Sequence, residues 1–245
     1  MRKFIFFILA SFLIFSCSNE KTKTFETGNF WKITSNSGVE SYIFGTIHLY
    51  PKGELELSQN IISKLEHSEI LALERDITNK SNQEQLSTSK QMQFIIKMYK
   101  ALASAYGNNL ISMEGELIDV ALKNHIAISG LETTDEILEN FEKTNLFDSL
   151  MLDMKPEQII EEFTLTLNMY KSEQILQIKD SLSSIWPKEM EELIVNERNR
   201  NWIDDIIQLI EKKQTFIAVG QGHLGGKDGL IQLLNDKGYK IERVY

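Results

Sequence analysis

The sequence predicts an α/β (α+β) fold, in which a central mixed sheet is built from N- and C-terminal segments and a large helical insertion forms a cap. Three observations support this prediction. Short apolar runs bounded by turn residues occur near both ends of the chain, and the centre is rich in Glu, Gln, Lys, Leu and Met with apolar residues three and four apart. The 245 residues are 42% apolar and 25% charged, as in an ordinary globular domain.

The N-terminal residues 1–16 are expected to be a secretory signal peptide. Two basic residues precede an apolar run that is shorter than a helix spanning the roughly 30 Å hydrocarbon layer of a bilayer, as is typical of a signal peptide. A small residue stands directly before Cys17, as in the bacterial lipobox, so we expect a lipid on Cys17 and a lipidated tether over residues 17–29. A plain signal peptide or an N-terminal anchor helix is the alternative.

The domain itself is expected to span residues 30–245, and its first part contains three strands and one helix. Apolar residues alternate or cluster over residues 30–35 and 41–47, with turn residues between them, which predicts a hairpin. Residues 57–65 carry apolar positions at helical spacing, and residues 70–73 are a short, fully apolar strand.

The centre of the chain, roughly residues 83–210, is expected to be the helical cap, interrupted by one strand near residues 126–131. The strand pattern returns at residues 215–219, followed by a glycine-rich loop and a helix over residues 228–236. A glycine ends that helix, and residues 239–245 alternate as a final strand.

Composition and motifs exclude several classes of function. The formal net charge is −9 and no Lys/Arg cluster is present, so nucleic acid is not an expected partner and membrane contact is expected through the N-terminal lipid only. Residues 220–225 spell GxGxxG, but no βαβ unit follows them, which argues against a dinucleotide site. The serine-hydrolase elbow GxSxG is missing from the sequence. The oligomeric state is left open.

Chemistry-bearing residues stand at the ends of the expected strands. His48, Glu74 and His223 each follow an apolar strand, and Glu132 follows the strand near residues 126–131. Ligands of open α/β sheets gather beyond the carboxyl ends of the strands, so we expect these side chains to converge.

Two imidazoles and a carboxylate are a chemically coherent set. His48, Glu74 and His223 could hold a divalent ion such as Mn, Co, Zn or Fe and leave positions open for water and substrate. Because the one cysteine is Cys17, thiolate ligands are not expected. Asp76 or Glu132 could then act as general base in the hydrolysis of a peptide or of a small ester or amide.

Glycines accompany both histidines. Gly45 and Gly220 each stand three residues before a histidine, and Gly222 lies in the second loop. A glycine at a strand end lets the backbone turn sharply and approach a ligand closely. Two Gly-x-x-His motifs in a chain with four histidines, each after an expected strand, indicate a site.

The order of the motifs resembles that of the TraB/GumN family over roughly residues 30–245. The segments that carry the resemblance are residues 44–48 (FGTIH), 71–74 (LALE), 130–133 (GLET), 197–199 (ERN) and 218–225 (AVGQGHLG). This family is similar to the Tiki-type Wnt-cleaving metalloproteases and, more distantly, to erythromycin esterases and haem-binding ChaN lipoproteins. The resemblance implies an active-site role for His48, Glu74 and His223, and a pocket-lining role for Arg198 and Asn199 on a late helix.

Each of these residues also has a plain structural alternative. The histidines could cap strands, Glu74 could pair with Arg75, Glu132 could cap the helix that follows it, and Arg198 could lie on a solvated helix face.

The function has alternatives as well. The first hypothesis is an exported, membrane-anchored lipoprotein of the bacterial periplasm or cell surface that acts as a metal-dependent hydrolase. The second is a non-enzymatic lipoprotein that binds haem, iron or a peptide in the same cleft. A third is a family member that acts through protein contacts alone.

Overall fold

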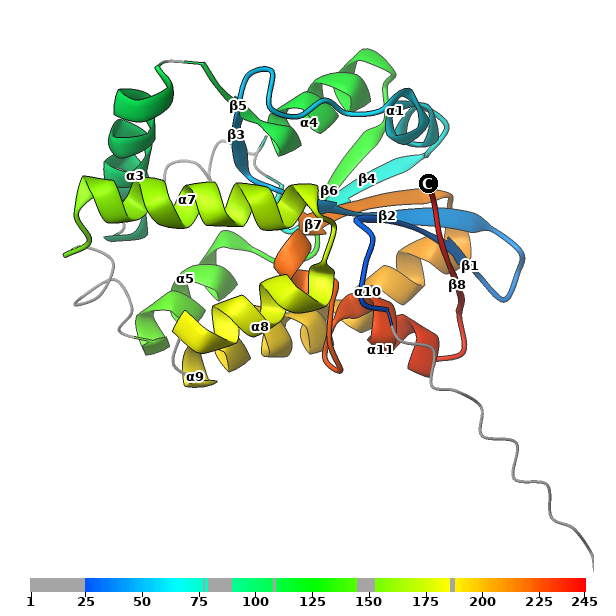
Figure 1. The fold of residues 1–245 in the computed structure, drawn as a ribbon. Helices are drawn as coiled ribbons and strands as arrows, with labels where there is room; N and C mark the ends of the chain where they lie inside the picture. Colours follow the sequence, from blue (N-terminus) through cyan, green and yellow to red (C-terminus); the bar gives the residue numbers. More distant parts are fainter. Residues whose placement is uncertain (1–24, 77, 79–89, 108, 145–152, 186–187) are drawn as a thin grey trace, which may run out of the picture.

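The computed structural model describes residues 25–76, 78, 90–107, 109–144, 153–185 and 188–245 (Figure 1). The expected signal peptide at residues 1–16 and the expected lipidation site Cys17 lie outside these ranges. Within the described ranges, no helix combines the length and the apolar character that crossing a membrane requires.

A six-stranded mixed sheet forms the centre of the molecule and confirms the predicted fold class. Its strands lie in the order β6 (Ala127–Gly130), β4 (Ile70–Leu73), β7 (Thr215–Gly220), β2 (Glu40–Thr46), β1 (Phe30–Thr34) and β8 (Lys240–Arg243). The first four are parallel to one another, whereas β1 runs antiparallel to both β2 and β8. The carboxyl ends of β2, β4, β6 and β7 therefore meet at one edge of the sheet.

The parallel strands read as continuous apolar runs because both faces of the sheet are covered. On one face, Phe44, Leu71 and Phe216 belong to a core cluster with residues of α1 (Gln59–Glu66) and α4 (Met113–Lys123). On the other face, Ile43 and Ile217 belong to a second cluster with α10 (Glu197–Lys212) and α11 (Leu230–Asp236). Successive strand residues thus alternate between two buried layers.

The helices begin where sequence chemistry permits. Ser58 caps α1 by accepting a hydrogen bond from the backbone N–H of Ile61, and Ser112 caps α4 by accepting one from Gly115. Ser112 also ends β5 (Leu110–Ser112), which pairs with β3 (Leu49–Pro51) in a small separate sheet. These two short strands were not expected from the sequence.

The segment expected as a helical cap divides into two parts. Its helices α4 and α10 cover the sheet, whereas α3 (Lys90–Tyr106) packs against α7 (Pro156–Lys171) (Figure 1). The end of α7 reaches the sheet, where Leu167 and Tyr170 join the core cluster of Phe44. The other helices that the structure describes in this segment are α5 (Thr134–Thr144), α8 (Ile175–Ile185), α9 (Lys188–Glu191) and a π-helical turn, η1 (Glu192–Asn196), that runs directly into α10.

Residues 25–29, the end of the expected tether, lie against the domain. The ring of Phe25 is buried and meets Trp31 edge to face with 5.5 Å between the centroids. The backbone N–H of Gly28 donates to the carbonyl of Glu173 at 2.7 Å. Residues 25–29 are therefore packed against the domain.

Candidate active site

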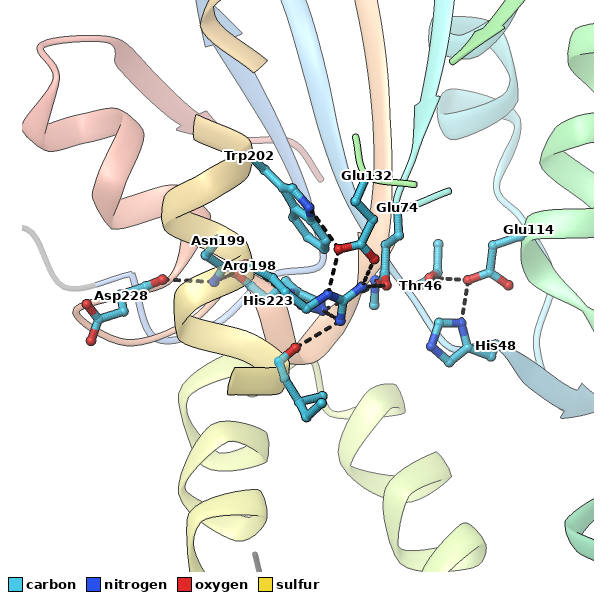
Figure 2. A network of polar contacts seen from close by, with 12 residues as sticks. Thr46, His48, Glu74, Glu114, Glu132, Arg198, Asn199, Trp202, His223 and Asp228 are labelled. Carbon is cyan, nitrogen blue, oxygen red and sulfur yellow. Dashed lines mark hydrogen bonds and ion pairs between the residues drawn. The ribbon is translucent and has the colours of Figure 1, made fainter. Parts of the chain in front are cut away.

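The four parallel strands deliver four ionisable residues to one edge of the sheet. His48 follows β2, Glu74 follows β4, Glu132 follows β6, and His223 ends the 3₁₀ turn η2 (Gln221–His223) that follows β7. Figure 2 shows Glu74, Glu132 and His223 around the guanidinium of Arg198, with His48 further along the same edge.

Arg198 is the centre of the network. It is 4% exposed, donates through Nε and Nη2 to the two carboxylate oxygens of Glu132 (2.9 and 2.5 Å), and through Nη2 to Glu74 Oε2 (2.6 Å). Nη1 donates to the carbonyl of Ile194 (2.8 Å) and points at His223 Nε2 (3.2 Å). Arg198 is thus buried and fully engaged, which rules out the solvated helix face considered from the sequence.

The π-helical turn η1 supplies one of these acceptors. Ile194 lies inside η1, and its carbonyl accepts a hydrogen bond from the guanidinium of Arg198, four residues further along the chain. Turns of this type often occur at functional sites because they release backbone groups from the regular helical pattern.

Asn199 fixes the tautomer of His223. Its amide nitrogen donates to two backbone carbonyls, those of His223 (3.1 Å) and Asp228 (2.8 Å), so the other amide atom is the oxygen. His223 Nδ1 lies 2.7 Å from that oxygen and must carry the proton. Burial lowers the pKa of His223 to about 3, so the ring is neutral with a bare Nε2.

His48 has a different environment. Its side chain is 70% exposed, and its Nδ1 lies 2.8 Å from Glu114 Oε1, which also accepts a hydrogen bond from Thr46 (2.6 Å). The Glu114 carboxylate raises the pKa of His48 to about 9. Both histidines therefore have Nδ1 held by an oxygen acceptor from a neighbouring helix.

Gly220 leaves the space in which these groups meet. Its N–H donates to Glu74 Oε1 at 2.8 Å. A Cβ at this position would lie 3.3 Å from Glu74 Oε1, 3.6 Å from His48 Nε2 and 3.7 Å from His223 Cδ2. Its φ is −53°, so the glycine is required for space and not for an unusual turn.

The pKa values of Glu74 and Glu132 are shifted in opposite directions. Burial acts to raise the pKa of Glu74, but Arg198 and the two histidines outweigh it and hold that pKa well below its ordinary value. Burial raises the pKa of Glu132 above its ordinary value, although Arg198 opposes this. Neighbouring groups whose environments separate their pKa values are typical of acid–base pairs in active sites.

The residues fit a metal ion in kind, but they are not already arranged around one. Among the described residues, no group of three or more His, Cys, Asp or Glu side chains is positioned to hold an ion. His223 Nε2 and Glu74 Oε1 lie 3.6 Å apart. Ligands about 2.1 Å from a tetrahedral zinc ion are separated by roughly 3.4 Å. Coordination would require Arg198 Nη1 to leave His223 Nε2, with which it is now in contact at 3.2 Å.

The remaining residues expected from the sequence have other contacts. Asp76 Oδ1 accepts hydrogen bonds from the backbone N–H and the hydroxyl of Thr78, on the loop after β4. Gly45 makes room for packing, since a Cβ there would lie 2.6 Å from Leu224 Cδ1. Gly222 is part of η2.

Three network residues were not found from the sequence. Glu114 lies in the first turn of α4, Thr46 ends β2, and the indole of Trp202 donates to Glu132 Oε2 at 3.2 Å. The ring of Trp202 also lies against that of His223, tilted by 40° and with 4.7 Å between the centroids. The signal for Trp202 was its helical spacing from Arg198, whereas nothing distinguished Glu114 from other acidic residues at helix starts.

The fold and this site define a three-layer α/β protein with a polar centre at the carboxyl edge of its parallel strands. Comparison with protein-family models matches residues 29–100 and 92–243 to the TraB/PrgY/gumN family, so the chain belongs to that family. Neither a curated protein nor a solved structure matches the chain significantly.

Proposed function

We propose that this protein is a metal-dependent hydrolase of peptide, ester or amide bonds, with His48, Glu74 and His223 as the ligands of a divalent ion. The orientation of the two histidines carries this proposal. Metal-binding histidines almost always donate their other ring N–H to a carboxylate or a carbonyl. Glu114 and Asn199 occupy these positions, and His48 Nε2 and Glu74 Oε1 approach the same point beside Gly220.

A divalent ion held here would supply an activated water and polarise the carbonyl to be cleaved. The chain's own residues provide the rest of the chemistry. Glu132, whose pKa is raised by burial, or Asp76 would accept the proton released by water. Arg198 Nη1, which faces the bare nitrogen of His223, would donate to a negatively charged oxygen of the substrate.

One observation favours a metal-free variant of the same reaction. The guanidinium of Arg198 already provides a cation between Glu74 and His223. The His48–Glu114 pair is the arrangement of a general base with its orienting carboxylate. In this second candidate, His48 Nε2 takes the proton of the attacking water when the ring is neutral, so the reaction should accelerate as the pH rises towards the His48 pKa of about 9.

Calorimetric titration of the full-length chain in detergent, stripped of metal, with Mn²⁺, Co²⁺, Zn²⁺ and Fe²⁺ tests the first proposal. We expect one-to-one binding that is lost in His48→Ala/His223→Ala. His67→Ala is the matched control, because His67 is exposed at the end of α1 and bonds only to the carbonyl of Ser63 among the described residues.

Loss of binding in the control, or binding that persists in the double variant, would contradict the ligand assignment. Hydrolysis that withstands chelators would favour the metal-free candidate. A haem Soret shift without hydrolysis, abolished in the double variant, would favour the binding lipoprotein.

We also propose that the protein is exported and held at the membrane by a lipid on Cys17. Cys17→Ser is expected to abolish incorporation of radiolabelled palmitate and to release the protein into the soluble fraction. Labelling that persists in Cys17→Ser would refute this assignment.

A further inference from the structure

A cavity of about 230 Å³ lies between α5 and α10, next to the candidate active site. We call it the α5–α10 cavity. Its lining includes Glu132, Arg198 and Trp202 of the site network (Figure 2). Pockets that enclose whole ligands measure about 300–1,000 Å³. The α5–α10 cavity is therefore suited to a single side-chain-sized group beside the centre.

The lining is strongly acidic. Two cations, Lys143 and Arg198, face five carboxylates, those of Glu132, Glu136, Glu139, Glu197 and Asp205. Three of the carboxylates are occupied: Glu132 by Arg198, Glu136 by Thr133, and Glu139 by Lys143 at 3.0 Å. In the part of the chain that the structure describes, the carboxylates of Glu197 and Asp205 form no hydrogen bond or ion pair.

An amide without a protein partner belongs to the same lining. Asn140 is 9% exposed and lines the cavity, yet its side chain has no hydrogen-bond partner within the described ranges. Its amide atoms are not among the fully buried unpaired atoms of the described residues, so they are accessible from the cavity. There the amide oxygen can accept a hydrogen bond from an N–H or O–H group of a ligand.

We propose that the α5–α10 cavity binds the guanidinium or ammonium group of a basic side chain of the substrate. Two free carboxylates supply charge, the Asn140 amide accepts an N–H, and Leu131 offers apolar contact for methylene groups. The role as a substrate subsite rests on the proposed function, whereas the binding of the cation does not.

Because the α5–α10 cavity adjoins the candidate active site, a group bound in it would influence which bond of a substrate is cleaved. Arg198 and Glu132 belong both to its lining and to the network that holds Glu74. A basic side chain in the cavity therefore places the adjoining bond of a peptide close to the centre. The expected specificity is cleavage near Arg or Lys.

Calorimetry with N-acetyl-arginine amide and the full-length protein in detergent tests the binding. Its neutral isostere, N-acetyl-citrulline amide, is the ligand control. Glu197→Gln/Asp205→Asn removes the two free carboxylates, and Glu142→Gln/Asp204→Asn removes two exposed carboxylates from the same two helices outside the lining. All four changes preserve side-chain shape.

We expect the cavity variant to bind the arginine probe about tenfold more weakly, which corresponds to about 1.4 kcal/mol. The control variant should stay within about twofold, and added salt should weaken the binding because the carboxylates are partly exposed. Equal binding of the arginine and citrulline probes, or equal losses in the two variants, would overturn the proposal. Tighter binding of spermidine than of the arginine probe would overturn the assignment to a peptide side chain.

A peptide-library cleavage screen separates this proposal from the proposed function. Arginine binding without any cleavage supports the cavity and counts against the hydrolase. Cleavage without preference for basic residues, together with no arginine binding, overturns the cavity and leaves the hydrolase standing.

Discussion

Removal of the Arg198 guanidinium should be among the most destabilising single changes in this protein. In Arg198→Met, the carboxylates of Glu132 and Glu74, whose side chains are 6% and 17% exposed, lose their shared cation. Removing one partner of a buried ion pair costs about 3–5 kcal/mol, since a buried charge is left without compensation. We expect a loss in that range in the free energy of unfolding at pH 7.

The destabilisation by Arg198→Met is limited by the free energy of protonating the carboxyl that is left without its cation, and this free energy depends on pH. Glu132 can escape by taking up a proton, and burial already raises its pKa above the ordinary value of 4.5. Protonating a carboxyl with that ordinary pKa at pH 7 costs about 3.4 kcal/mol, at roughly 1.4 kcal/mol per pH unit. At pH 5 the same proton costs only about 0.7 kcal/mol. The destabilisation by Arg198→Met should therefore shrink as the pH falls from 7 to 5.

Urea unfolding followed by circular dichroism at both pH values measures this effect. Arg200→Met is the matched control, because Arg200 lies on the same helix, is 42% exposed and pairs with Glu192 and Asp228. Exposed pairs contribute about 0–1 kcal/mol. Arg198→Met/Glu132→Leu should recover part of the lost stability, since one buried charge leaves with the cation. A loss below about 1 kcal/mol for Arg198→Met, or an equal loss at pH 5 and pH 7, would refute this reasoning.

Three further predictions follow from the site and its support. Gly220→Ala should weaken metal binding in calorimetry by about tenfold, because the new Cβ would lie 3.3 Å from Glu74 Oε1. The unfolding midpoint should not change. An unchanged metal affinity would contradict the inference that Gly220 keeps the space between Glu74 and the two histidines open. Asn199→Leu should lower metal affinity about 10–100-fold, as expected for the partner that orients a ligand, and nitrogen NMR should show that His223 loses its single tautomer; a preserved tautomer would contradict this. Lys179 of α8 is buried and donates to Asn196 Oδ1 at the end of η1. Burial lowers its pKa, so between the folded and the ordinary pKa the unfolded chain binds more protons, and the free energy of unfolding should rise with pH in the parent but not in Lys179→Met. Urea midpoints that change in parallel with pH in the two proteins would contradict this.

Much of the sheet was predictable because its strands are short, apolar and bounded by glycine or polar residues. The strands expected at residues 41–47, 70–73 and 215–219 are β2, β4 and β7, and their parallel order follows from the helices between them. The residues that follow these strands could therefore be assigned to one edge of the sheet from the sequence. What the pattern could not give was the cation at the centre of that edge.

The environment of His48 illustrates what was out of reach. Its partner Glu114 is brought in by the small sheet of β3 and β5, whose three-residue strands are too short to show any periodicity. The two Gly-x-x-His motifs are alike in letters but differ in physical role. Gly45 makes room for a packed leucine, whereas Gly220 opens the space between Glu74 and both histidines.

The burial of Arg198 could have been predicted from its position on α10. The buried stripe of α10 runs through Trp202, Ile203, Ile206 and Ile210, and Arg198 lies one helical turn before the first of them. A charged residue that continues an apolar stripe is placed in the core, and it stays there only with partners, which here are two carboxylates and the carbonyl of Ile194 in η1. The same helix directs its exposed acidic residues into the α5–α10 cavity. The late helix is therefore expected to serve both the chemistry of the centre and the choice of substrate.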